Sequence, residues 1–485
     1  GWKLSSLWVI ILLLIFAAGL WQEKEAIEAN KAGKVLLIVN VVLVALSIYF
    51  FKDGVQVFYL ATALLLSLTL SLLLFLILKE TNEEKKGYLK YLLVLVAAAE
   101  VAGSSYRVVN NKSGLDAQVL KEEIYYNDAT QELLAQVEDE TDFYRVDKQY
   151  TSTAYCDSLY QRYKGTASYI GGVGDNDYTQ KLYNYLGLPV LEHVQRGTDQ
   201  NTIINALCNV KYVMTKNQRL NTYGLEYRSG KDGITLYESK YTLPFGYVYD
   251  TYMTESDFLE YNYVDRRNLM MERCILGDEA GELLPEGIKE DAFYRDFSEK
   301  WKAYQAETTL EGKEIHFAPI QEGEVAILKL TTSAQEDAWA EAYYMQGNVM
   351  LGKVDVRLVK GKSSRYMEFM LAGTDRIPVS AVTSKPYEIA SVELYVIPQE
   401  VYFAQLPEWI EERSQGSFQM SHFEEEQIEG TAVLSQDSIM VFTIPYDENW
   451  SAWADGKKQR LLQANVGFMG LALSEGSHEI ILKYR

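Results

Sequence analysis

The sequence has few of the residues that build metal and disulfide sites. Its 485 residues include three cysteines and four histidines. Cys156, Cys208 and Cys274 are an odd number without a CxxC spacing, and the histidines form no HxH or HExxH pair. This pattern disfavours a zinc site or a disulfide framework, and it leaves open whether any two cysteines pair. We expect no metal and no cofactor.

Common motifs of soluble enzymes are missing as well. The chain has no GxSxG motif, which in hydrolases places a nucleophilic serine on a sharp turn. The glycine-rich stretch 171–174 lacks the Lys and Ser or Thr that complete a phosphate-binding loop. No catalytic residue can be named from such motifs, and the catalytic residues remain unknown.

Long apolar runs dominate the beginning of the chain. They cover residues 4–21, 35–51, 57–78 and 88–109. An α-helix rises about 1.5 Å per residue and a bilayer core is about 30 Å thick, so runs of this length are candidates to span a membrane. The sequence therefore predicts four transmembrane helices within residues 1–110.

Charge separates the same two parts of the chain. The full sequence has 46 Lys and Arg and 67 Asp and Glu. Residues 1–110 hold 10 basic and 8 acidic residues, so residues 111–485 hold 36 basic and 59 acidic residues and have a net charge of −23. Such an acidic segment repels nucleic acid. Loops 22–34 and 79–90 hold seven lysines, against four basic residues on the opposite side, so these loops are predicted to be cytoplasmic. The protein is then a multi-pass cell-membrane protein with a large extracytoplasmic domain.

The water-facing part shows three patterns. Residues 111–250 contain both helical and strand patterns and predict a mixed α/β domain. Residues 251–305 are predicted to form a helical connector. In residues 306–485 apolar and polar residues alternate with period two. Period two with intervening turns is typical of a β-sandwich. The predicted fold class is an α+β membrane protein: transmembrane α-helices, then a mixed α/β extracytoplasmic domain and a C-terminal β-sandwich.

Polar residues interrupt the fourth apolar run on one face. Glu100, Ser104 and Arg107 are spaced i, i+4 and i+7, so they share one side of a helix. A carboxylate in an apolar helix usually faces a protein interior or a water-filled cavity, and a guanidinium can bind a phosphate with two parallel hydrogen bonds. These residues are candidates to contact a donor phosphate. The alternative is a structural ion pair with other helices.

Aromatic residues form a second candidate site. The chain has 36 tyrosines, and Tyr155, Tyr160 and Tyr163 cluster around Arg162. Aromatic rings beside polar groups suit sugar recognition, so we consider these four residues as glycan contacts. Tyrosine also fills strands and half-buried surfaces, which is the alternative explanation.

Several short blocks together resemble one family. They are Phe143-Tyr144-Arg145-Val146, Tyr163-Lys164-Gly165, Asn209-Val210-Lys211-Tyr212-Val213, Leu236-Tyr237-Glu238, Pro445-Tyr446-Asp447, Trp450, Trp453, Asp455-Gly456-Lys457, Asn465, Gly467-Phe468 and Gly476-Ser477-His478. In this order, over residues 90–485, they resemble the YfhO family of bacterial membrane proteins. The first three apolar runs match it only in being apolar.

The resemblance implies a function. Members are similar to GT-C-type glycosyltransferases, which implies addition of sugar from a polyprenyl-phosphate donor to a cell-envelope polymer such as teichoic acid. The expected partners are the lipid bilayer, a lipid-linked sugar and a cell-wall polymer. The family's catalytic acid is expected in N-terminal helices that this sequence lacks, and a final membrane helix is also expected beyond it. Alternatives are a non-catalytic membrane-anchored protein whose ectodomain binds glycan, and a component of a lipid-sugar transporter.

Overall fold

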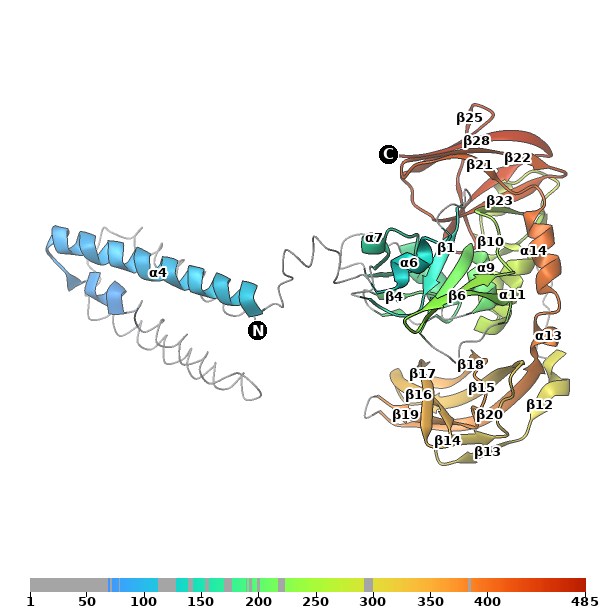
Figure 1. Cartoon of the computed structure of the whole chain (residues 1–485), viewed down its shortest axis with the longest axis horizontal. Helices are drawn as coiled ribbons and strands as arrows, with labels where there is room; N and C mark the ends of the chain where they lie inside the picture. Colours follow the sequence, from blue (N-terminus) through green and yellow to red (C-terminus); the bar gives the residue numbers. More distant parts are fainter. Residues whose placement is uncertain are drawn as a thin grey trace. The chain divides into compact units, whose positions relative to one another are not determined.

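The computed structural model describes residues 69, 72–77, 79–111, 128–137, 143–152, 157–169, 177–188, 190–191, 194–198, 201–216, 223–291, 300–382 and 385–485. The chain divides into two compact units, Gly1–Lys121 and Glu122–Arg485. We describe each unit by itself (Figure 1).

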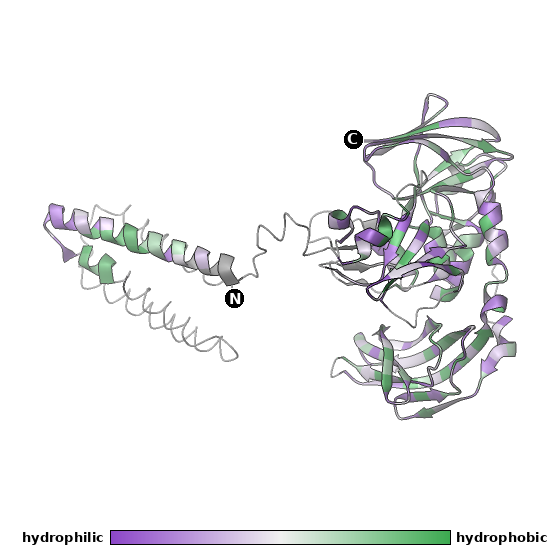
Figure 2. Cartoon of the chain, in the orientation of Figure 1, coloured by the Kyte–Doolittle hydropathy of each residue, from purple (hydrophilic) through white to green (hydrophobic). Residues whose placement is uncertain are grey.

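The main described element of the first unit is helix α4, Glu83–Asn111. The side chain of Asn82 accepts hydrogen bonds from the backbone N–H groups of Glu84 (3.0 Å) and Lys85 (3.2 Å), which satisfies two donors at the helix start. Acidic residues in the first turn also favour the positive end of the helix dipole. Figure 2 shows hydrophilic residues at this start and apolar residues along the middle.

The predicted fold class is wrong in its first part. Among the helices that the structure describes, none is both long and apolar enough to cross a membrane. The predicted run 88–109 lies within α4, but Lys90 and Glu100 interrupt it, and a charged side chain is costly in the apolar core of a bilayer. The predicted spans 4–21 and 35–51 lie outside the described residues, as does 57–78 apart from residues 69 and 72–77.

The second unit begins with small sheets and short helices. One sheet has the strand order β1-β5-β7-β6 and another the order β2-β4-β3. The strands are β1 Arg145–Lys148, β2 Ala167–Tyr169, β3 Val190–Leu191, β4 Val194–Arg196, β5 Val210–Thr215, β6 Leu225–Lys231 and β7 Ile234–Ser239. The helices are α6 Thr130–Leu134, α7 Asp157–Gln161, α8 Asp177–Tyr185 and α9 Thr202–Leu207.

A seven-stranded sheet joins distant parts of the chain, in the order β11-β9-β10-β26-β27-β23-β8. The strands are β8 Gly246–Tyr249, β9 Thr251–Thr254, β10 Cys274–Leu276, β11 Lys289–Glu290, β23 Ser438–Pro445, β26 Leu462–Ala464 and β27 Phe468–Leu473. Alternate residues of β23 enter different cores: Ile439 and Val441 belong to one, Met440 and Phe442 to the other. Both faces of this sheet are therefore buried.

Helices cover one face of the seven-stranded sheet. They are α10 Glu255–Leu259, α11 Tyr263–Glu272 and α14 Leu406–Ser414. Helix α13 Gln399–Tyr402 and the 3₁₀ turn η2 Lys302–Tyr304 instead contact strand β20 (Tyr387–Pro398) of another sheet, and η1 Ala280–Leu283 is a further 3₁₀ turn. Residues 251–305, predicted as a helical connector, thus contribute strands β9, β10 and β11 as well as α10 and α11.

Residues 305–398 form two further sheets, with the orders β12-β20-β15-β18 and β13-β14-β19-β16-β17. The strands are β12 Gln305–Ala306, β13 Thr308–Glu311, β14 Glu314–Phe317, β15 Glu324–Ala334, β16 Ala338–Gln346, β17 Val349–Leu358, β18 Gly361–Phe369, β19 Arg376–Ala381 and β20 Tyr387–Pro398. The two sheets share one core, to which β15 contributes Ala326 and Leu328. The intervening residues Val325 and Ile327 instead belong to the core that also contains Ile439 and Val441 of β23.

The remaining sheet, of order β21-β22-β28-β24-β25, packs against the other face of the seven-stranded sheet through a shared core. Its strands are β21 Gln419–Phe423, β22 Gln427–Leu434, β24 Trp450–Ala454, β25 Lys457–Gln459 and β28 Gly476–Tyr484. The predicted single C-terminal β-sandwich is therefore wrong. Residues 306–485 divide between two sheet packings, because β23 pairs with β8 and β26 pairs with β10, which places β23, β26 and β27 in one sheet with strands from 246–290.

Asn465 connects strands β10 and β8 of the seven-stranded sheet. Its side-chain oxygen accepts a hydrogen bond from the backbone N–H of Ile275 (3.0 Å), and its amide nitrogen donates to the hydroxyls of Tyr249 (3.0 Å) and Tyr247 (3.3 Å). Asn465 is fully buried and has φ 46°, a left-handed conformation that asparagine tolerates better than most residues.

We predict that Asn465→Gly lowers the free energy of unfolding by about 2–4 kcal/mol, because the buried Ile275 N–H loses its acceptor and the hydroxyls of Tyr247 and Tyr249 each lose a donor, while the backbone conformation stays accessible. Chemical denaturation of the purified protein measures this. Asp232→Gly is the control, since Asp232 also has a positive φ (50°) but is exposed. Equal stability of the two variants would show that the Asn465 bonds are unimportant.

Candidate functional site

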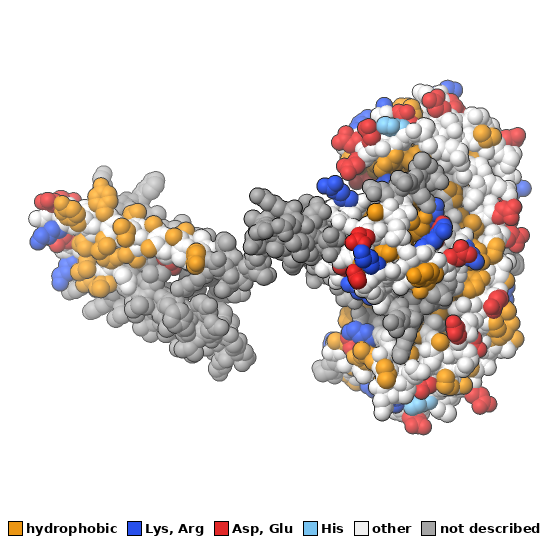
Figure 3. All heavy atoms as spheres, in the orientation of Figure 1, with side chains coloured by type: hydrophobic (Ala, Val, Ile, Leu, Met, Phe, Trp, Pro, Cys, Tyr) orange, Lys and Arg blue, Asp and Glu red, His pale blue; other side chains and the backbone are white. Residues whose placement is uncertain are grey.

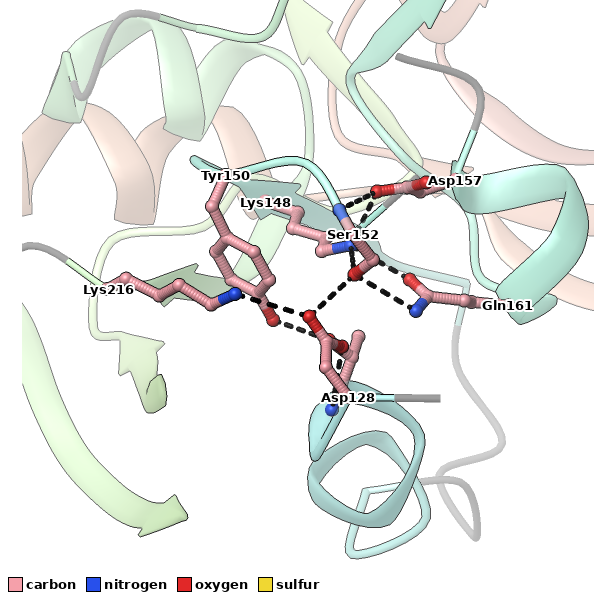
Figure 4. A network of polar contacts seen from close by, with 8 residues as sticks. Asp128, Lys148, Tyr150, Ser152, Asp157, Gln161 and Lys216 are labelled. Carbon is pink, nitrogen blue, oxygen red and sulfur yellow. Dashed lines mark hydrogen bonds and ion pairs between the residues drawn. The ribbon is translucent and has the colours of Figure 1, made fainter. Parts of the chain in front are cut away.

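The candidate site lies where two parallel strands end. Strand β1 pairs with β5 in parallel, with Lys148 opposite Met214. Their carboxyl ends therefore lie at the same edge of the sheet, where α/β sheets commonly bind ligands. Polar side chains from β1, β5, α6 and α7 meet at this edge (Figure 4).

Lys148 is the centre of this polar network. Its side chain is only 2% exposed, and its Nζ donates to Asp157 (2.7 Å), Gln161 (2.9 Å) and Ser152 (2.5 Å). The backbone N–H of Ser152 also donates to the Asp157 carboxylate (2.6 Å). A buried ion pair is tolerated when further hydrogen bonds satisfy both partners, and that condition is met here.

Asp128 extends the network toward the surface. Its carboxylate accepts hydrogen bonds from the Ser152 hydroxyl (2.8 Å), from Lys216 (3.3 Å) and from the hydroxyl of Thr130. The Thr130 hydroxyl also contacts the hydroxyl of Tyr150 (2.6 Å). The Nζ atoms of Lys148 and Lys216 each lie 4.5 Å from the centre of the Tyr150 ring. The ring thus separates two cations, and each gains a cation–π contact.

Burial and charge shift the pKa values of these groups. Burial lowers the pKa of Lys148, while the hydrogen bond and charge of Asp157 oppose that shift. Burial would raise the pKa of Asp128, but hydrogen bonds from Thr130 and Ser152 and the charge of Lys148 outweigh it, so the pKa of Asp128 lies below its ordinary value.

The network fixes a short surface segment. Asp157 and Gln161 are the first and last residues of helix α7, and both are buried. Between them, Leu159 is 78% and Tyr160 52% exposed. Because the buried ends of α7 are bonded to Lys148, the arrangement holds a rigid, partly aromatic surface toward solvent. Lys148 is paired with a carboxylate, so the arrangement does not favour removal of the Ser152 proton.

The predicted glycan-contact residues have different environments. Tyr160 and Arg162 are exposed at α7 and directly after it, and Arg162 has φ 54°. Tyr163 is half-buried and packs against the core beneath the sheet, where burial raises its pKa. Tyr155 lies outside the described residues. Of the three residues of this group that the structure describes, Tyr160 and Arg162 are the exposed ones.

The other predicted group lies on α4, in the first unit. Glu100, Ser104 and Arg107 are all within this helix, and Glu100 is half-buried. Their common helical face is consistent with the i, i+4 and i+7 spacing.

Metal ligands and reactive thiols are two further kinds of functional group. The structure places no group of three or more His, Cys, Asp or Glu side chains suited to a metal ion within the residues that it describes. Cys208 and Cys274 are both free thiols, and burial raises their pKa values to about 11 and about 12. Such thiols are unreactive near neutral pH. Cys156 lies outside the described residues.

Sequence reasoning missed Lys148, Asp157 and Asp128. One signal was available: Lys148 follows Val146 by two positions, so a strand places its side chain on the buried face. A buried lysine needs a carboxylate partner. No local pattern identifies Asp157 or Asp128 as partners, because Asp157 lies nine residues after Lys148 and Asp128 lies 20 residues before it.

A model of the family described as "Bacterial membrane protein YfhO" matches residues 6–485. The chain belongs to the YfhO family. It is similar to the uncharacterized protein YfhO of Bacillus subtilis (strain 168), with 23% identity over 291 residues, 56% of this chain and 32% of that protein. The chain thus spans about a third of that relative's length.

Similarities to solved structures are weak. A structure named "BiXyn10A CBM1 APO" matches 19% of this chain and 68% of its own, with 12% identity and a TM-score of 0.15. The arabinofuranosyltransferase AftD from Mycobacteria matches 37% of this YfhO-family chain and 21% of its own, with 9% identity and a TM-score of 0.14. TM-scores this low support no argument about fold or function.

We predict that Lys148→Met lowers the free energy of unfolding by about 3–5 kcal/mol, because it leaves the buried Asp157 carboxylate without a cation. Denaturant titration measures the loss. Lys216→Met is the matched control: its partly exposed pair with Asp128 is expected to contribute less than about 1 kcal/mol. Similar losses in both variants would contradict the central role of Lys148.

The pKa of Asp128 predicts a pH effect. A folded-state pKa below the unfolded value near 3.8 adds stability that is present above that value and is lost as pH falls through the folded-state pKa. Asp128→Asn should therefore lose less unfolding free energy than the parent between about pH 5 and pH 2. Asp232→Asn, at an exposed turn, should keep the parental pH dependence. An unchanged acid profile in Asp128→Asn would refute this explanation.

Proposed function

We propose that the chain is the C-terminal part of a polytopic membrane glycosyltransferase. The full-length protein would transfer a sugar from a polyprenyl-phosphate donor to a cell-envelope polymer such as teichoic acid. Membership of a bacterial membrane protein family supports the membrane setting. The reaction needs a base for the acceptor hydroxyl and cationic help for the departing phosphate.

The unit Glu122–Arg485 is proposed to lie on the extracytoplasmic side of the cell membrane and to handle the polymer. Its acidic side chains are spread over the face shown in Figure 3, which disfavours nucleic acid as a partner. The proposed partners are the lipid bilayer, the lipid-linked sugar and the cell-wall polymer.

One observation carries the proposal for acceptor binding: the surface formed by Tyr160 and Arg162 is exposed on a helix whose two ends are buried and bonded to Lys148. An aromatic ring offers an apolar face to a sugar ring, and a guanidinium donates to hydroxyl oxygens. A rigid surface loses little entropy when a polymer binds. We therefore assign acceptor orientation to Tyr160 and Arg162.

The donor phosphate is proposed to contact α4. Glu100, Ser104 and Arg107 share a face of this helix, and Arg107 supplies a guanidinium that suits phosphate oxygens. The catalytic base is not among these residues, since the family's catalytic acid is expected in the N-terminal region.

A glycan-binding protein without transferase activity is the main competing function, and a lipid-sugar transporter component is another. The exposed Tyr160 surface would serve a binding protein equally well. Transfer of label from donor to polymer separates the enzyme from both, because neither a binder nor a transporter forms a new glycosidic bond.

We predict that Tyr160→Ala raises the KM for the polymer acceptor about tenfold, with kcat less affected, because an aromatic sugar contact contributes about 1 kcal/mol or more. Full-length protein in membranes with a labelled polyprenyl-phosphate sugar gives both constants. Leu159→Ala, an exposed neighbour on α7, is the control and should keep the parental KM. Equal KM values in both variants and the parent would remove α7 from acceptor binding.

We also predict that Arg107→Ala reduces transfer at least tenfold at matched protein levels, because the departing phosphate loses a charge-assisted contact. Glu100→Gln tests the other polar group on the same face. Lys90→Ala changes a cation elsewhere on α4 and should leave transfer intact. Full transfer by both Arg107→Ala and Glu100→Gln would make this face structural.

A further inference from the structure

A cavity of about 500 Å³ lies in the second unit, away from the Lys148 network. Helix α14, the C-terminal end of α11, the β8–β9 connection and the β22–β23 connection form its walls. This volume is within the range of small-molecule sites in proteins. None of Lys148, Asp157 and Tyr160 lines the cavity.

Charged groups of both signs line this cavity. The acidic lining residues are Asp250, Glu272, Asp291, Glu408 and Glu412, and the basic ones are Arg273 and Arg413. Five carboxylates against two guanidinium groups make the local field negative. A phosphate or carboxylate ligand would be repelled.

Carboxylates of the cavity wall already pair with its two arginines. Arg273 is buried and bonds the carboxylates of Glu272 (2.9 Å) and Asp291 (3.0 Å). Arg413 pairs with Glu412 (3.2 Å). The charge of both arginines is therefore partly neutralised by neighbouring carboxylates, and both are held in place as hydrogen-bond donors.

The guanidinium group of Arg413 has hydrogen-bond donors without a partner among the described residues. The Arg413 side chain is 8% exposed and its Cζ lies 4.7 Å from the centre of the Tyr249 ring. Its Nε and Nη1 have no hydrogen-bond partner among the described residues. A buried donor without a partner costs free energy that an acceptor would recover.

We propose that this cavity binds a neutral saccharide. Each sugar hydroxyl both donates and accepts, so it can bond to a carboxylate and to an amide or guanidinium group at once. Gln405, Gln415 and Gln436 add amides that present both donors and acceptors, although Gln436 already donates to Asp250 (3.1 Å), and the largely buried Trp409 forms part of the wall. Within the described residues no three of these carboxylates form a group suited to a metal ion, which disfavours a simple cation as the ligand.

This site goes beyond the proposed transferase function. It is a second saccharide site, separate from the α7 surface, and it is defined by binding and not by sugar transfer. The saccharide could be a further sugar unit of a polymer bound at α7, or it could be a free saccharide. The groups that bind it are the same in both cases.

Glu408 gives the sharpest test. It is exposed on α14 and lines the cavity, whereas Glu411, exposed on the same helix, does not. Full-length protein in lipid nanodiscs would be titrated with glucose, galactose, N-acetylglucosamine, cellobiose and inorganic phosphate, and binding followed by saturation-transfer NMR. We expect at least one of the neutral sugars to bind the parent. Its affinity should fall about tenfold in Glu408→Gln and stay parental in Glu411→Gln.

Two further variants make the outcome decisive. Gln405→Ala, also exposed and lining the cavity, should weaken the same sugar. Tyr160→Ala should leave it unchanged. No binding of any neutral sugar, or binding of phosphate in its place, would overturn the inference. If Tyr160→Ala abolishes sugar binding and Glu408→Gln does not weaken it, the inference is also overturned. The proposed transferase function would then remain intact.

Discussion

The structure of the second unit depends on burying both faces of one mixed sheet. Strands from residues 246–290 and from 438–473 complete this sheet together, so neither segment can form it alone. One face packs on helices and the other on a further sheet, with alternate residues of β23 serving the two cores. Hydrophobic burial on both sides is therefore the constraint that brings the chain's distant parts together.

The candidate acceptor surface depends on that sheet through Arg145. This residue begins β1, and its guanidinium donates to the backbone carbonyls of Cys208 (3.0 Å) and Thr443. Thr443 belongs to β23 of the seven-stranded sheet. The same short strand ends at Lys148, which holds α7. A single strand thus connects the central sheet to the segment that exposes Tyr160, and the surface has a rigid support.

Several elements follow from local patterns in the sequence. The apolar run Val210–Thr215 forms strand β5, helix α8 ends shortly before Gly187, which has φ 69°, and Asp455-Gly456 forms the turn between β24 and β25 with φ 53° and 74°. These features follow from residues that are neighbours in the chain. Period-two alternation in residues 354–358, 392–396 and 480–484 likewise predicted strands that are present.

Features set by distant partners were not predictable in the same way. Alternation shows which face of a strand is buried, but it does not name the neighbouring strand, so residues 306–485 were assigned to one sandwich. The polar residues around Lys148 come from four separate segments, and no spacing joins them. Tyr163 shows the same limit: it shares a cluster with Tyr160 in sequence, yet its ring is turned into the core.

The central claim is that the full-length protein forms glycosidic bonds and that this chain helps to orient the acceptor. The most direct measurement is transfer of a labelled sugar from polyprenyl phosphate to purified cell-wall polymer by membranes that contain the protein, compared with membranes that lack it. The account predicts label in the polymer that depends on the protein. Polymer that is retained by the protein but never labelled would contradict it and would identify a glycan-binding protein.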